Sequence, residues 1–145
     1  MYRHILYATD FSKASLSTER KVAEMSKQLN AQLSIIHVVN FGSTVWMGGG
    51  GYFVLAQHDD ETIDNSKKAL EACKDRITVD LRHTHTVQGS PKQEIVNYAE
   101  QIGADLVVLG SHGHRQVSDL LGTTATGVLH KAKCDVLVIQ SSEED

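Results

Sequence analysis

The sequence lacks long apolar runs, is poor in cysteine and proline, and has no excess of basic residues. Its 145 residues include two cysteines and one proline, and 14 Lys and Arg stand against 18 Asp and Glu, for a formal net charge of -4. This balance excludes a strongly basic nucleic-acid-binding protein, because neutralising phosphates requires clustered Lys and Arg. No run of 18 apolar residues is present, so we expect no membrane-spanning helix.

The two cysteines and the N-terminus favour a cytoplasmic protein. Cys73 and Cys134 form no C-x-x-C pair, and each lies within an apolar pattern. We interpret both as buried packing residues in a protein of a reducing compartment. A disulfide between them is the alternative. Residues Met1–His4 lead directly into an apolar stretch that is too short for a secretory signal peptide, and we expect none.

Five segments have the composition of β-strands. Four are near-continuous apolar runs rich in β-branched residues, as in parallel strands that are covered on both faces. These runs are His4–Ala8, Leu33–Val39, Asp105–Leu109 and Asp135–Ile139. A fifth segment, Asp80–Val87, alternates apolar with polar residues and is predicted to be an edge strand with one solvated face.

Helical patterns occupy the segments between these strands. The predicted helices are Lys13–Leu29 with Ser12 as N-cap, about Asp60–Ile77, a third that begins at Ser90–Gln93, and roughly Thr123–Ala132. The third begins with a capping box that has Pro91 at the first helical position, and Gly103 ends it. In the fourth, Ala125, Val128 and Leu129 are predicted to face inward.

The alternation of strands and helices predicts an α/β fold. Right-handed crossovers produce one doubly wound, five-stranded parallel sheet with four helices, in strand order 3-2-1-4-5, as a single domain over residues 1–145. The connection at about 41–59 contains Gly48–Gly51 and the aromatic Phe41, Trp46 and Phe53. We favour a flexible surface loop there over a lid, because glycine-rich segments order poorly.

The candidate site lies where the strand order reverses, between the first and fourth strands. Ligands of open α/β sheets bind beyond the carboxyl ends of the strands at this point. Thr9 and Asp10 follow the first strand after Ala8, and Gly110–Gly113 follow the fourth strand after Leu109. Ligand-binding residues are therefore predicted on both of these connections.

The second connection has the features of a phosphate-binding loop. Glycines at 110 and 113 permit close approach to a ligand, and Gly122, Thr123 and Thr124 open the last helix, whose N-terminus favours an anion. Asp10 can accept hydrogen bonds from ribose or adenine. The alternative is structural: the glycines only turn the chain, Thr123 caps a helix, and Asp10 supports the start of the first helix.

Several of these segments together resemble the universal stress protein family. They are Ile5–Ser12, Ile36–Val38, Gly89–Pro91, Gly110–Gly113, Gly122–Thr123 and Ala132–Val138. The resemblance runs from residue 3 to about 140 and implies a flavodoxin-like or Rossmann-like domain. It also implies a homodimer, formed by pairing of the last strands at Val136–Ile139.

The resemblance further implies a place in the ATP-binding branch of that family. By the pattern G-x-x-G, about nine residues, then G-[S/T], the ribose and phosphates would be held by the loop after the fourth strand. The binding residues so assigned are Ala8, Thr9, Asp10, Val38, Leu109, Gly110, His112, Gly113, His114, Gly122, Thr123 and Thr124. One departure is that Gly113 and Gly122 enclose His114–Leu121, one residue fewer than the usual nine.

Fast catalysis is not indicated. The sequence has no G-x-x-x-x-G-K-[S/T] motif, and residues 110–124 contain no lysine, so a triphosphate would be neutralised by backbone N–H groups, His112, His114, Arg115 and Mg²⁺ or Mn²⁺. His83 and His85 alone make a weak zinc site and are interpreted as solvated surface. His37 is interpreted as a hydrogen-bonded histidine of the core or of a strand end, and not as a metal ligand.

Three functional hypotheses follow from these residues and the resemblance. The first is a cytoplasmic, dimeric stress-response sensor or adaptor that binds ATP, ADP or AMP with slow or no hydrolysis. The second is an enzyme that hydrolyses ATP or transfers a phosphoryl group. The third is a dimeric interaction module that binds no nucleotide. A flavin electron carrier is disfavoured, because no aromatic-flanked loop follows the first or fourth strand.

Overall fold

The computed structural model describes residues 1–39, 44–47, 51–54, 60–111 and 121–140. Five parallel strands form the central sheet in the order β5-β2-β1-β6-β7. Their bounds are β1 (His4–Ala8), β2 (Gln32–Val39), β5 (Leu81–Gln88), β6 (Leu106–Gly110) and β7 (Asp135–Ile139). Numbered within this sheet alone, the order is 3-2-1-4-5, so the prediction of a doubly wound α/β fold is confirmed.

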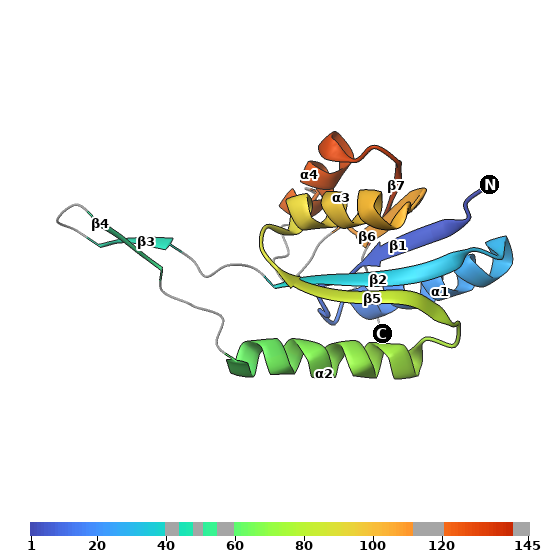
Figure 1. Ribbon diagram of the computed structural model, residues 1–145, viewed down its shortest axis with the longest axis horizontal. Helices are drawn as coiled ribbons and strands as arrows, with labels where there is room; N and C mark the ends of the chain where they lie inside the picture. The colour runs from blue at the N-terminus through green and yellow to red at the C-terminus, as the bar shows by residue number, and fades with distance from the viewer. Residues whose placement is uncertain (40–43, 48–50, 55–59, 112–120, 141–145) are drawn as a thin grey trace.

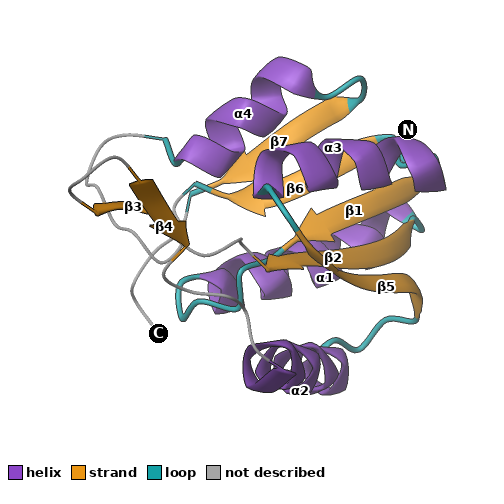
Figure 2. Cartoon of the chain, turned by 60° about the vertical axis from the view of Figure 1, so that its left-hand side comes forward, coloured by secondary structure: helices purple, strands orange, loops and turns teal. Residues whose placement is uncertain are grey.

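Helices cover both faces of the sheet in the described part of the chain. They are α1 (Ser15–Leu29), α2 (Asp60–Arg76), α3 (Pro91–Ile102) and α4 (Thr123–Lys131). The first two lie against one face and the last two against the other (Figure 2). None of these helices combines the length and apolar character that crossing a membrane requires.

The two faces of the sheet form two apolar clusters. Alternate residues of each strand point to opposite faces, so Ile5 and Tyr7 pack under α1 and α2, whereas Leu6 and Ala8 pack under α3 and α4. All five residues of β1 are buried, because this strand has neighbours on both sides and helices on both faces. The edge strands β5 and β7 are only partly buried, as alternation predicts for β5.

Two predicted helix caps are wrong, although the helices are present. α1 begins at Ser15 and not Lys13, and its N-cap is Ala14. The Ser12 hydroxyl is buried without a hydrogen-bond partner among the described residues, and the Ser12 carbonyl oxygen instead accepts from the N–H and hydroxyl of Ser15. Backbone turning at Phe11, whose φ is 58°, moves Ser12 away from the helix start.

The capping box of α3 also forms no side-chain cap, although Ser90 is the N-cap and Pro91 the first helical residue. The Gln93 amide donates to Asn97 one turn further along the helix. Gly103 ends the helix in the left-handed conformation, as predicted, with a φ of 69°.

The predicted loop at 41–59 contains regular structure. β3 (Thr44–Met47) and β4 (Gly51–Val54) pair antiparallel as a separate two-stranded sheet, which Figure 1 draws apart from the five-stranded sheet. β-Branched and aromatic residues occupy these strands, and such residues favour strand conformation despite the adjoining glycines. The predictions for residues 41–43, 48–50 and 55–59 lie outside the described residues.

The prediction that Leu129 faces inward is also wrong. Ala125 and Val128 are buried on α4, but Leu129 is 45% exposed, and Leu137 on the neighbouring strand β7 is 36% exposed. A helix that packs on an edge strand buries only the stripe that faces the sheet, and Leu129 lies beside that stripe.

Candidate functional site

The carboxyl ends of β1 and β6 lie side by side at the point where the strand order reverses. Tyr7 pairs with Val108 in the parallel ladder, and the residues that follow them are Ala8, the last of β1, and Leu109, the last but one of β6. Both residues are buried, at 9% and 4% exposure. The connections that leave them, predicted as the two halves of a binding site, therefore begin at the same edge of the sheet.

The connection after β1 is held by hydrogen bonds between its own side chains and backbone. Phe11 N–H donates to the Thr9 hydroxyl at 3.1 Å, and Ser12 N–H donates to Asp10 Oδ1 at 2.8 Å. Phe11 has a φ of 58°, an uncommon conformation for a bulky side chain, and residues of this kind concentrate at functional sites. Asp10 is half-buried, and its carboxylate is held in place by the hydrogen bond from Ser12 N–H.

His37 supports the same connection from β2. Its Nδ1 donates to the Thr9 carbonyl oxygen at 2.9 Å, and its ring lies 4.4 Å from that of Phe11, centroid to centroid. His37 is thus a hydrogen-bonded strand-end histidine, as predicted from the sequence. Its role in supporting the loop was not predicted, because the contact joins residues 28 positions apart.

Val38 lies on the α3 and α4 face of β2 and packs against the cluster that contains Ala8. It pairs with Val87 of β5, and the next residue, Val39, accepts a hydrogen bond from Gly89 N–H at 2.9 Å. Ala8 and Val38, both predicted for the adenosine end, therefore lie on the same face of the sheet.

The connection between β6 and α4 begins and ends at the same place, because Gly122 at its end lies against Ser111 at its start. Ser111 N–H donates to the Ile139 carbonyl oxygen at 2.9 Å, and Gly122 N–H donates to the Ser111 carbonyl oxygen at 2.8 Å. The second bond brings the start of α4 to the end of β6. Gly110 is half-buried beside it.

Among the residues that the structure describes, no side chain caps the N-terminus of α4. Gly122 is the N-cap, and Thr123 and Thr124 are the first two helical residues, so the structural alternative in which Thr123 caps this helix is wrong. Thr123 is exposed and Thr124 half-buried. The first N–H groups of a helix lie at the positive end of the helix dipole, and such a position is suited to an anion.

Three predicted site residues, His112, Gly113 and His114, lie outside the described residues. The described ones fall into two groups at one edge of the sheet. Ala8, Thr9, Asp10 and Val38 are on the β1 and β2 side, and Leu109, Gly110, Gly122, Thr123 and Thr124 are on the β6 side.

One of the two histidines on the edge strand β5 differs from the predicted solvated state. His83 is exposed, but His85 is half-buried and stacks on Tyr98 of α3 with ring centroids 4.4 Å apart, which corrects the prediction for His85. His4 is buried beneath α3, with its Nε2 2.7 Å from the Ser34 hydroxyl. Among the residues that the structure describes, no three His, Cys, Asp or Glu side chains are grouped to hold a metal ion.

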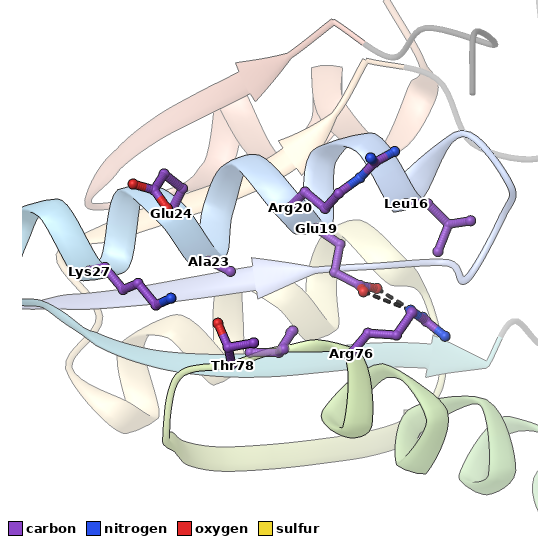
Figure 3. A pocket seen from close by; sticks show the side chains of 9 residues that line it. Leu16, Glu19, Arg20, Ala23, Glu24, Lys27, Arg76 and Thr78 are labelled. Carbon is purple, nitrogen blue, oxygen red and sulfur yellow. Dashed lines mark hydrogen bonds and ion pairs between the residues drawn. The ribbon is translucent and has the colours of Figure 1, made fainter.

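A separate cleft of about 560 Å³ lies between α1 and the end of α2 (Figure 3). The ion pair of Glu19 and Arg76 crosses it, and Lys27 and Thr78 lie toward its other end (Figure 3). None of the predicted site residues lines this cleft. It is distinct from the edge of the sheet where those residues gather.

The universal stress protein family model matches residues 1–140. The chain belongs to the universal stress protein family. Universal stress protein A homolog 1 of Coxiella burnetii is 35% identical over 143 residues, covering 98% of this chain and 99% of that protein. Universal stress protein MJ0531 of Methanocaldococcus jannaschii is 30% identical over 151 residues, covering 100% of this chain and 86% of that protein.

Solved structures of family members have the same fold. MJ0577 of M. jannaschii superposes with a TM-score of 0.78 at 24% identity, and the match covers 98% of both chains. A universal stress protein in complex with cAMP superposes with a TM-score of 0.66 at 23% identity, covering 97% of this chain and 98% of that one. At these identities the likeness shows the fold.

Proposed function

We propose that the chain binds an adenine nucleotide, ATP in the first place, between the connections that follow β1 and β6. The hydrogen bond from Gly122 N–H to the Ser111 carbonyl oxygen carries the proposal. It brings the N-terminus of α4, which no described side chain caps, to the edge of the sheet where Asp10 follows β1. An anion site and a hydrogen-bond acceptor at one strand-order reversal suit the two ends of a nucleotide.

Each predicted residue has a role in this proposal. The N–H groups of Thr123 and Thr124 hold phosphate oxygens, helped by the loop residues His112, Gly113 and His114. Asp10 accepts from the ribose hydroxyls, and Ala8, Thr9 and Val38 contact the adenosine. Leu109 and Gly110 form the base of the proposed site, and the glycine permits close approach of the nucleotide to the backbone. The family member solved with cAMP supports an adenine nucleotide as the ligand.

A divalent cation, Mg²⁺ or Mn²⁺, would be held through the phosphates and not by a dedicated protein cage. The described residues contain no group of three potential ligands, and phosphate-bridged binding is the usual mode for Mg²⁺. The cation would neutralise phosphate charge that no lysine of residues 110–124 can neutralise.

The proposed role is that of a stress-response sensor or adaptor with slow or no hydrolysis. The sequence contains no P-loop lysine motif, and that motif supplies much of the charge stabilisation in P-loop phosphoryl transfer. We further propose that the chain works as a cytoplasmic homodimer in which Val136–Ile139 of two copies pair. Half-exposed apolar side chains on the edge strand β7 support this pairing.

Calorimetric titration of the purified protein with ATP, ADP, AMP and cAMP tests the binding site. We expect Asp10→Ala to weaken ATP binding about 10-fold or more, since it removes hydrogen bonds to a charged group. Gly113→Val is expected to abolish binding while the protein stays folded. Asp80→Ala is the matched control, because Asp80 is an exposed carboxylate just before β5, at the opposite edge of the sheet.

The outcomes separate the three functional classes. Binding without phosphate release over hours supports the sensor, and the mass of nucleotide released on denaturation identifies the retained ligand. Sustained turnover would instead support an enzyme. If wild-type protein binds none of the four nucleotides, the proposal is contradicted, and the remaining hypothesis is an interaction module.

A further inference from the structure

Tyr7 is a polar residue at the centre of the core, one position before the end of β1. It is fully buried on the face covered by α1 and α2, among Val22, Leu33 and Cys73. Burial raises the pKa of the Tyr7 hydroxyl, with the Glu19 carboxylate nearby adding to the rise. The side chain therefore stays neutral and keeps its O–H as a donor. A buried hydroxyl is costly unless it is hydrogen-bonded, so its partner is informative.

The Tyr7 hydroxyl donates to the carbonyl oxygen of Ser15 at 3.1 Å, within the first turn of α1. The Thr9 hydroxyl also lies near enough to lower the Tyr7 pKa through hydrogen bonding. Tyr7 thus contacts the connection after β1 at both of its ends. Thr9 begins that connection, and Ser15 follows it as the first residue of the helix.

From Ser15 the hydrogen bonds continue back to Asp10. The N–H and the hydroxyl of Ser15 both donate to the Ser12 carbonyl oxygen, at 3.0 Å and 2.6 Å. Ser12 N–H in turn donates to Asp10 Oδ1 at 2.8 Å. Three successive contacts therefore connect the buried Tyr7 hydroxyl with the carboxylate at the sheet edge.

The first turns of α1 are also fixed from the other side. The Glu19 carboxylate is 3% exposed and accepts from Arg76 Nε at 2.8 Å, from a second nitrogen of the same guanidinium at 3.0 Å, and from the Cys73 thiol at 3.2 Å. Figure 3 shows this pair joining α1 to the end of α2. This ion pair anchors the first turns of α1, and the Ser15 carbonyl that accepts from the Tyr7 hydroxyl belongs to the same turns.

We propose that Tyr7 is a positioning residue that sets the conformation of Thr9–Ser12 and so aims the Asp10 carboxylate at the ligand. The inference rests on the proposed nucleotide site, to which it adds a buried determinant. Tyr7 does not touch the ligand. It stabilises the strained turn at Phe11, where the chain would relax if its ends were less firmly held.

Tyr7→Phe tests this role, because it removes the hydroxyl and keeps the ring that fills the core. We expect ATP affinity to fall about three- to tenfold, the effect of losing one buried hydrogen bond. Tyr98→Phe is the matched control, a buried tyrosine on the opposite face of the sheet that stacks on His85. It should change ATP affinity less than about twofold. Thermal unfolding verifies that both variants are folded.

A double-mutant cycle with Asp10→Ala separates positioning from a general structural effect. If Tyr7 acts through Asp10, adding Tyr7→Phe to Asp10→Ala should cost less than about twofold in ATP affinity. An undiminished loss in that background, or wild-type affinity in the single variant Tyr7→Phe, overturns the proposal.

Amide hydrogen exchange without any nucleotide makes the test independent of the proposed function. We expect the amide of Ser12 to exchange several-fold faster in Tyr7→Phe than in wild type and Tyr98→Phe. If wild-type protein binds no nucleotide, the proposed function fails, and this measurement alone decides whether Tyr7 holds the loop. Unchanged exchange of Ser12 then overturns the inference.

Discussion

At the scale of single residues, His4 shows how burial makes the stability of the fold depend on the titration of one side chain. It is 6% exposed, with Nε2 facing the Ser34 hydroxyl at 2.7 Å. Desolvation is the main cause that lowers its pKa, and the positive charge of Arg82 and neighbouring His83 add to it. A hydrogen bond to the Ile102 carbonyl and the charge of Asp105 oppose the shift without reversing it.

We therefore expect the free energy of unfolding to decrease as the pH is lowered, because of His4. Because the folded-state pKa lies below the unfolded value, the unfolded state takes up the proton first as pH drops below about 6.5. The stabilisation is complete above that pH and is lost on the way down to the folded pKa. Urea unfolding at about pH 7.5 and pH 5 measures the loss. His4→Gln should reduce it, and His130→Gln, an exposed control on α4, should not. An equal loss in His4→Gln would contradict this assignment.

At the scale of elements, the contact between α3 and α4 depends on one glycine. A Cβ at Gly127 would lie 2.6 Å from Lys92 Cδ and 2.8 Å from Lys92 Cβ, closer than carbon atoms can approach. The Lys92 Cβ cannot move away without its backbone. The missing side chain of Gly127 therefore sets how closely α4 approaches the start of α3, and with it the place of the α4 N-terminus.

Gly127→Ala is expected to destabilise the protein by about 1 kcal/mol, although alanine is the better helix former. The gain in helix propensity is about 1 kcal/mol, whereas overpacking costs about 1–3 kcal/mol. Thr126→Ala is the control, since this exposed neighbour on α4 gains propensity without a clash. Chemical denaturation of both variants measures the difference. A Gly127→Ala protein as stable as Thr126→Ala would contradict the packing argument.

At the scale of the whole molecule, the two edges of the sheet differ in chemistry. On the edge strand β5, the exposed residues are Arg82, His83 and Gln88. On the edge strand β7, Asp135 is exposed at the start, and the rest is apolar, with Leu137 exposed and Val136, Val138 and Ile139 half-buried. Charged side chains protect an edge strand from pairing, and apolar ones invite it. The exposed Leu129 of α4 lies beside the apolar edge. This asymmetry supports the proposed pairing of two copies through β7.

Leu137→Glu is expected to shift the protein from dimer toward monomer, because a carboxylate would be buried at each copy's edge. Sedimentation velocity over a range of concentrations measures the change. Gln88→Glu, which adds the same charge at the end of the opposite edge strand, should leave the distribution as in wild type. A monomeric wild-type protein at high concentration would contradict the dimer.

Much of the fold was predictable because the relevant signals are local. Near-continuous apolar runs marked the central strands, alternation marked β5 as an edge, and Gly103 marked the end of α3. The hairpin of β3 and β4 was not predicted, because the run of glycines between the two strands is typical of a flexible loop. The prediction of Ser12 as N-cap is wrong because the chain takes a left-handed turn at Phe11. That turn is supported by Thr9 and by His37, and His37 comes from a distant part of the chain.

The sequence by itself determined the strand order and the family, because periodicity and short motifs depend only on neighbouring residues. It also predicts the edge of the sheet at which we propose that a ligand binds. Tertiary structure alone decided which polar groups meet inside the fold: Tyr7 with Ser15, Glu19 with Arg76, and His85 with Tyr98. A buried polar group must find a partner wherever the chain brings one, and the partner is set by packing between elements.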